Sequence, residues 1–132
     1  MSKFSLEILN KYIYPYTLTS DPDVLLGSVF GEDVALTRIG DDILISHVDP
    51  IVGAIAHIGW LAVHVACNDV ATSGARPRWL LLLVLVPGVD DVELLGEIMQ
   101  DASRAAAEVG ASIIGGHTGY SSGLSRPLVA VT

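Results

Sequence analysis

Residues 54–86 read AIAHIGWLAVHVACNDVATSGARPRWLLLLVLV, and this stretch decides the fold. Residues 54–73 are rich in Ala, Ile, Val and Leu over a length that favours a buried helix rather than a strand. Gly74 and Pro77 follow, as is typical of a helix end. The apolar run Trp79–Val86 then predicts a strand that is buried on both of its faces.

The segment before this stretch predicts one helix and a hairpin. Apolar residues recur at roughly helical spacing over residues 5–14, and Pro15 is expected to end that helix. Residues 16–31 are rich in Thr, Ser, Asp, Pro and Gly, which indicates a loop. Strands are expected at 34–39 and 43–48, joined by a turn at Gly40-Asp41-Asp42. Asp49-Pro50 is expected to close the hairpin, because proline cannot continue a ladder.

The segment after it predicts a further helix and two strands. A helix is expected over about 91–109, capped by Asp90 or Asp91 and ended by Gly110. A short strand at 111–114, a loop at 115–119 and a strand at 127–132 complete the order α-β-β-α-β-α-β-β. We therefore expect a mixed α+β domain with a sheet backed by helices.

Composition excludes several classes of protein. The 132 residues carry a formal net charge of −8 and a pI of about 4.6, which argues against a reader of nucleic-acid backbones. A single cysteine, Cys67, allows no internal disulfide framework and fits a cytoplasmic protein. The longest apolar run is too short to span a bilayer, so no membrane association is expected.

Four polar clusters lie at or within apolar elements. They are Gly31-Glu32-Asp33, His47-Val48-Asp49, Asn68-Asp69 and Gly115-Gly116-His117-Thr118. Asp69 is the most informative, because a charged residue in a buried helix is costly unless it is paired or bound to metal. Each cluster also has an ordinary structural interpretation. Asp33, Asp49 and the glycine pair suit turns, and Asp69 suits a solvent-facing helix end.

The order of these clusters resembles one superfamily over about residues 25–132. It groups aminoimidazole ribonucleotide (AIR) synthetase, formylglycinamidine ribonucleotide synthetase, thiamine-monophosphate kinase, selenophosphate synthetase and the hydrogenase-maturation protein HypE. The most specific part is Asn68-Asp69-Val70-Ala71-Thr72-Ser73-Gly74-Ala75-Arg76-Pro77. Phe30-Gly31-Glu32-Asp33-Val34-Ala35 and Val48-Asp49-Pro50 look most like HypE.

The resemblance implies an ATP-binding N-terminal domain covering 1–132, in which 1–24 are an N-terminal helix and loop and the family's C-terminal domain is absent. Two copies are expected to pair through their sheets into a barrel. Asp33, Asp49 and Asp69 look like ligands of Mg²⁺. The implied nucleotide contacts are Asn68, Gly115, Gly116, His117 and Thr118.

The resemblance also sets the expected chemistry. It implies an ATP-dependent ligase, kinase or dehydratase that activates a carbamoyl or similar oxygen by phosphorylation, with no catalytic residue assigned. His117 stands where several members carry a carboxylate, which is a better magnesium ligand than imidazole. The alternatives are a kinase or ligase of the thiamine-monophosphate or purine-biosynthesis type, and a dimeric scaffold that has lost its chemistry. The second substrate, a small molecule or a carried group, is left open.

Overall fold

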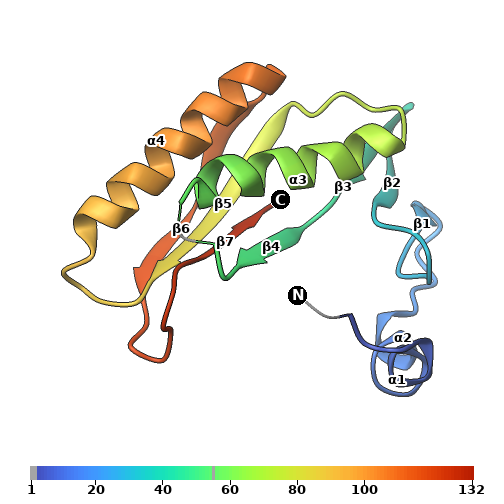
Figure 1. Cartoon of the computed structure of the whole chain (residues 1–132). Coiled ribbons are helices and arrows are strands. Elements are labelled where there is room, and N and C mark those ends of the chain that lie inside the picture. Colours follow the sequence, from blue (N-terminus) through green and yellow to red (C-terminus); the bar gives the residue numbers. More distant parts are fainter. Residues whose placement is uncertain (1–2, 55) are drawn as a thin grey trace. The chain divides into compact units, whose positions relative to one another are not determined.

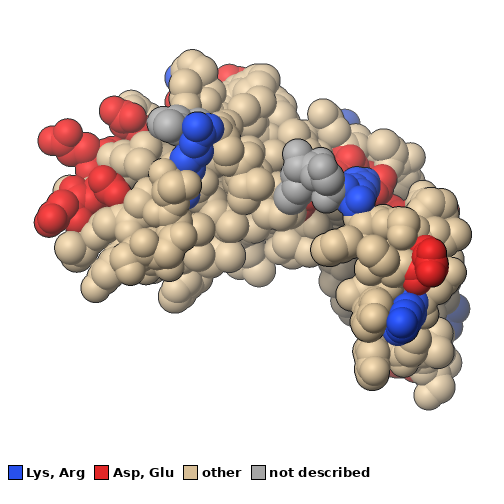
Figure 2. Space-filling model, turned by 60° about the horizontal axis from the view of Figure 1, so that its bottom comes forward, with Lys and Arg blue, Asp and Glu red and all other residues tan. Residues whose placement is uncertain are grey.

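The computed structural model describes residues 3–54 and 56–132, which divide into two compact units, 1–47 and 48–132. Each unit is described by itself (Figure 1). No helix among the described residues is long and apolar enough to cross a membrane. Figure 2 shows one face of the surface, on which Lys and Arg side chains are few and scattered.

The first unit contains two short helices and a three-stranded sheet. Its elements are α1 (Leu6–Tyr12), α2 (Tyr14–Thr17), β1 (Val24–Leu26), β2 (Ala35–Ile39) and β3 (Asp42–Ser46). The strands pair in the order β1-β2-β3, and both pairings are antiparallel. The predicted hairpin is therefore present as β2 and β3.

Two expectations for this unit are wrong. Pro15 does not end the helical region. It occupies the first turn of α2, where its missing N–H has no helical partner to lose. The predicted loop 16–31 contains β1, which is only three residues long and too short to show an alternating pattern.

The second unit is a four-stranded sheet with two helices. Its elements are β4 (Asp49–Val52), α3 (Ile58–Thr72), β5 (Trp79–Val86), α4 (Val92–Val109), β6 (Ser112–Tyr120) and β7 (Leu128–Val131). The strand order is β4-β7-β5-β6. β5 and β6 run parallel and are joined by α4, whereas β7 is antiparallel to both β4 and β5. Both helices lie on the same side of the sheet (Figure 1).

The core of the second unit lies between this sheet and its helices. Leu80, Leu82, Val84 and Val86 of β5 are buried, as are Val129 and Val131 of β7. The intervening β5 residues face the other side, where Trp79 is 54% exposed and Leu81 46% exposed. The expectation that β5 is buried on both faces is therefore wrong for this chain alone, because only one face is covered by helices.

Pro50 lies inside a strand rather than after one. β4 continues through Asp49-Pro50 and pairs with β7, with Pro50 opposite Ala130. The expectation that Asp49-Pro50 ends the strand pairing is wrong. β4 is an edge strand, and an edge strand tolerates a residue without an N–H.

The predicted loop 115–119 is also strand. β6 runs on to Tyr120, and Gly116 has a φ of +146°. A Cβ at this position would lie 1.9 Å from the carbonyl oxygen of Leu82 on β5. Gly116 is therefore required by the close approach of the two strands beside the irregularity in their register.

α3 and α4 run in the same direction and make two matching polar contacts. His57 Nδ1 lies 3.2 Å from Asp101 Oδ2, and His64 Nε2 lies 3.0 Å from Glu108 Oε2. Both pairs are 44 residues apart, so the helices are parallel and in one register. Trp60 Nε1 also donates to Glu108 Oε2 at 2.8 Å.

The close packing of these helices depends on Gly59. A Cβ there would lie 2.1 Å from the carbonyl oxygen of Ile98 in α4.

At the start of α4, the Asp91 side chain accepts a hydrogen bond from Gly88 N at 2.8 Å and makes no capping bond to the helix. Asp91 is thus the N-cap by position, but its side chain stabilises the preceding turn.

Candidate metal centre

Asp49 is directed to the helix side of the sheet by the pairing of its strand. It lies opposite Val131 of β7, which is fully buried beneath the helices. Paired residues of an antiparallel ladder point to the same face, so the Asp49 carboxylate also points toward the helix layer. Asp49 is half-buried there, and α3 packs against its strand.

Asp69 is directed toward the sheet by the helical repeat of α3. Ala62 and Ala66 are buried, and Asp69 follows them by seven and three residues, which places all three on one helix face. Asp69 is half-buried at the end of that stripe. Its partial burial on the sheet side contradicts the solvent-facing interpretation.

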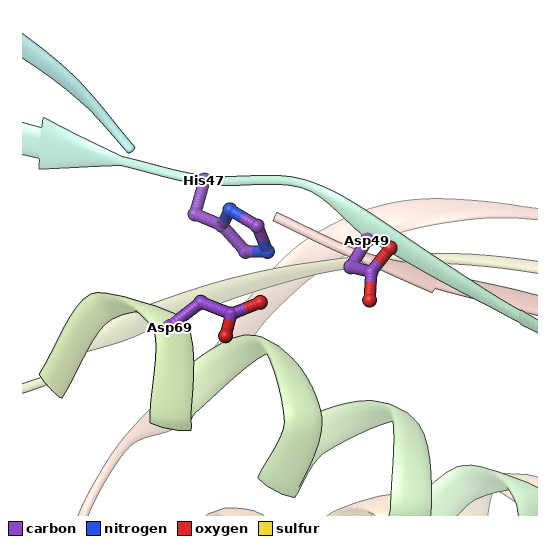
Figure 3. Close-up of side chains that lie close together, drawn as sticks. All are labelled: His47, Asp49 and Asp69. Atoms are coloured by element: carbon purple, nitrogen blue, oxygen red, sulfur yellow. The ribbon is translucent and has the colours of Figure 1, made fainter. Parts of the chain in front are cut away.

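Figure 3 shows the Asp49 and Asp69 side chains together with His47. One ligand atom from each of the three residues lies within 4.8 Å of the other two. His47 is the residue directly before the second unit, and only Val48 separates it from Asp49. All three side chains are half-buried.

The His47 ring is held by a bond on its other side. Nδ1 is hydrogen-bonded to the backbone carbonyl oxygen of Asp33, so Nδ1 carries the proton and donates it. The carbonyl therefore fixes the orientation of the His47 ring. Figure 3 shows the far end of the ring pointing into the space beside the two carboxylates.

The donor set fits a divalent cation. Two carboxylates at this separation repel one another, and a dication between them converts that repulsion into attraction. Carboxylate oxygens suit Mg²⁺ and Mn²⁺, and imidazole nitrogen suits the later transition ions. Of the predicted ligands, the structure thus brings Asp49 and Asp69 together.

The other predicted site residues are exposed to solvent. Asp33 belongs to the first unit, where its exposed carboxylate lies 4.0 Å from Lys3 Nζ. Asn68 is exposed, because neighbouring residues of a helix point about 100° apart. Gly115, Gly116, His117 and Thr118 lie along the exposed strand β6.

Sequence reasoning missed His47 as a member of this cluster and treated it as an ordinary strand residue. The signal was its spacing. Residues i and i+2 of an extended chain share a face, so this spacing could have indicated that His47 and Asp49 point the same way. The contribution of Asp33 through its backbone carbonyl has no sequence signal at all.

Comparison with known families gives evidence on this chain that is independent of the geometry of the cluster. Residues 31–132 match the family described as AIR synthase related protein, N-terminal domain. The chain belongs to this family. The match includes every residue of the cluster and each of the predicted nucleotide contacts.

Individual relatives agree with this assignment. The chain is 33% identical over 116 residues to a selenide, water dikinase of Desulfitobacterium hafniense, a match that covers 85% of this chain and 34% of that protein. The chain thus spans about a third of the length of the curated relatives it matches.

Solved structures share the mixed α+β fold. AaThiL complexed with AMPPCP and TMP is 21% identical with a TM-score of 0.68, covering 79% of this chain and 35% of that one. Hydrogenase maturation protein HypE in complex with ATP is 23% identical with a TM-score of 0.59, covering 85% and 34%. The expected fold class and superfamily are confirmed, with HypE among the structural neighbours.

Proposed function

We propose that this chain is the nucleotide-binding part of an ATP-dependent enzyme, in which Asp33, Asp49 and Asp69 hold Mg²⁺ against the phosphates. The convergence of Asp49 and Asp69 on one space carries the proposal, because a strand and a helix far apart in sequence supply two half-buried carboxylates. The chain's family and the ATP and AMPPCP in related structures support nucleotide as the ligand.

The charge of the protein explains why a metal is needed. With a net charge of −8 and few basic side chains, the chain has little means of neutralising a triphosphate directly. Bound Mg²⁺ would supply that positive charge and orient the phosphates. The carboxylates position the ion, and Asn68, Gly115, Gly116, His117 and Thr118 are proposed to contact the nucleotide.

The proposed reaction is phosphorylation of an oxygen atom on a second substrate, as in a HypE-like activation of a carbamoyl group. Positioning and charge neutralisation by the site would supply most of the rate enhancement. Selenide, water dikinase and thiamine-monophosphate kinase among the similar proteins make a kinase of either type the alternative within the same chemistry. We also propose that the protein acts in the cytoplasm.

Association of two copies through the sheet is part of the proposal. The face of the second unit away from its helices carries Trp79, Leu81, Leu83 and Leu85 of β5, of which the first two are about half exposed. Burying such a face in a homodimer would remove this apolar surface from water. Light scattering after size-exclusion chromatography should give twice the chain mass, and a stable monomer would contradict this association.

The nucleotide site is tested by calorimetric titration with a non-hydrolysable ATP analogue, with and without Mg²⁺. Binding should require Mg²⁺. Asp69→Asn should weaken it by at least about tenfold with little change in melting temperature, because a lost metal contact acts on binding. Asp90→Asn is the matched control, since Asp90 is an exposed turn residue.

Two results would count against the assignment. Strong destabilisation by Asp69→Asn with unchanged affinity would make the residue structural. Dimerisation without any Mg²⁺-dependent nucleotide binding would favour the scaffold, a candidate suggested by the imidazole of His117 at a position where several family members are expected to carry a carboxylate.

A further inference from the structure

The open face of the four-stranded sheet, which is the face away from α3 and α4, carries one titratable side chain among the described strand residues. Residues paired across neighbouring strands share a face, so the register places each of them. β4, β7 and β5 contribute only apolar residues to the open face, such as Val52, Leu128 and Leu85. The open-face residues of β6 are Ser112, Gly115, His117 and Gly119.

His117 lies beside leucine side chains on this face. It is paired with Leu83 of β5, and its nearest neighbours on the same face of β6 are two glycines. A Cβ on Gly119 would lie 3.4 Å from Leu85 Cδ2 and 3.5 Å from His117 Nε2, so both side chains reach over that glycine. Anything that covers the leucines therefore also covers the imidazole.

A proton on this ring would have no compensating carboxylate within the second unit. Among the described residues, none of the ion pairs involves His117. α4 also packs against β6, but it does so on the opposite face of the sheet. The charged residues next to the strand ends are Arg78, Asp90, Asp91 and Arg126. Arg78 stacks on the Trp79 ring, and the Asp91 carboxylate is bound to Gly88 N.

We infer that the protonation state of His117 controls the association of two copies through the open face, which the neutral imidazole permits and the imidazolium opposes. The inference rests on the association included in the proposed function and adds the group that regulates it. A second copy suits this face because each chain has a net charge of −8, so that copies repel one another in general. The open face is a surface on which two acidic chains can meet without bringing carboxylates together.

The direction of the effect follows from desolvation. Covering the face removes His117 from water, and an unpaired charge in an apolar contact is costly. An identical face brings no carboxylate to offset that cost. Imidazole changes its charge between about pH 8 and 5, and the associated state binds fewer protons than two separate copies. Association should therefore be strongest above this range and should weaken as the pH falls through it.

The test is sedimentation equilibrium of the 132-residue chain at several pH values, without nucleotide, because His117 is also a proposed nucleotide contact. The dissociation constant of the wild-type dimer should rise at least about tenfold from pH 7.5 to 5.5, since each dimer contains two such imidazoles. His117→Gln cannot become charged and should lose most of this change. His57→Asn is the control, because it removes an exposed imidazole from another part of the chain and Asn accepts the positive φ there.

His117→Lys gives a second variant, which is charged at every pH used. It should weaken association at least about tenfold at pH 7.5 while circular dichroism shows an unchanged fold. A dimer with a pH-independent dissociation constant, an equal pH dependence in His117→Gln, or a His117→Lys dimer as tight as wild type would overturn the inference and leave the association itself intact. A wild-type monomer at every pH would overturn both, and the Mg²⁺-dependent nucleotide titration tests the nucleotide site separately.

Discussion

Replacing Gly59 with alanine should push α3 away from α4. The new Cβ would lie 2.1 Å from the carbonyl oxygen of Ile98 and 3.0 Å from the backbone nitrogen of Ala102. Carbon and carbonyl oxygen ordinarily approach no closer than about 3.3 Å, so the backbones must separate by roughly 1 Å at this crossing. Neither neighbour is a flexible side chain, so the strain falls on the helix packing itself.

The size of the effect follows from two opposing terms. Overpacking of a well-packed interface costs about 1–3 kcal/mol and occasionally more, and this contact is severe enough for the upper end. Alanine in place of glycine inside a helix stabilises the folded state by about 1 kcal/mol through its higher helix propensity. The free energy of unfolding should therefore fall by about 2 kcal/mol, which lowers the melting temperature by roughly 5–10 °C for a chain of this size.

Thermal unfolding followed by circular dichroism measures this change, and Gly96→Ala provides the matched control. Gly96 lies on the exposed face of α4, and a Cβ there meets nothing within 4 Å. Gly96→Ala should raise stability by about 1 kcal/mol through helix propensity alone. A Gly59→Ala variant that melts at or above the wild-type temperature would refute the close helix crossing.

Three further predictions follow from single residues. Gly116→Ala should destabilise the fold by at least about 2 kcal/mol in denaturant unfolding, because its Cβ meets the Leu82 carbonyl, and unchanged stability would contradict that strand approach. The hydrogen bond from Trp60 lowers the pKa of Glu108 below 4.5, so its stabilising contribution is complete above that value and is lost as the pH falls through the folded-state pKa. Glu108→Gln should therefore be less stable than wild type at neutral pH and converge with it in acid, and parallel pH profiles would refute this. Burial raises the pKa of the Cys67 thiol, so alkylation of the native protein at pH 8 should be far slower than of the denatured chain, and equal rates would contradict its burial.

Most of the fold could be predicted from periodicity and helix-end signals. The strand Trp79–Val86 was identified with its observed bounds, and the helices α3 and α4 were found because long apolar patterns end at glycines. The errors arose where tertiary context overrides local chemistry. Pro50 is accommodated because β4 is an edge strand, and strand order is invisible in a single sequence.

The glycines of β6 show a second limit of sequence reasoning. Gly115 and Gly116 were interpreted as a loop, because paired glycines usually mark turns. Gly116 instead allows the backbone of β6 to pass close to β5. Their proposed contact with nucleotide stays a prediction, and the structure adds a second reason for glycine at position 116.

The candidate site was predictable in part. Asp49 and Asp69 stood out as polar residues at or within apolar elements, but their role as metal ligands came from the family resemblance. The structure brings the two carboxylates together. His47 was not selected, since a single histidine in a strand is unremarkable without knowledge of what faces it. Its orientation comes from a backbone carbonyl, and backbone groups are the same in every sequence.

The two edges of the four-stranded sheet are chemically different, and this limits how copies of the chain can grow into larger assemblies. β4 carries Pro50, which has no N–H to offer to an incoming strand, whereas β6 is a nine-residue edge strand of mostly exposed residues. Open-ended fibres need an accepting edge on both sides of each copy. Because Pro50 weakens pairing at β4, edge-to-edge association of two copies is expected at β6, and a symmetric pair formed there has no second β6 edge left to extend it.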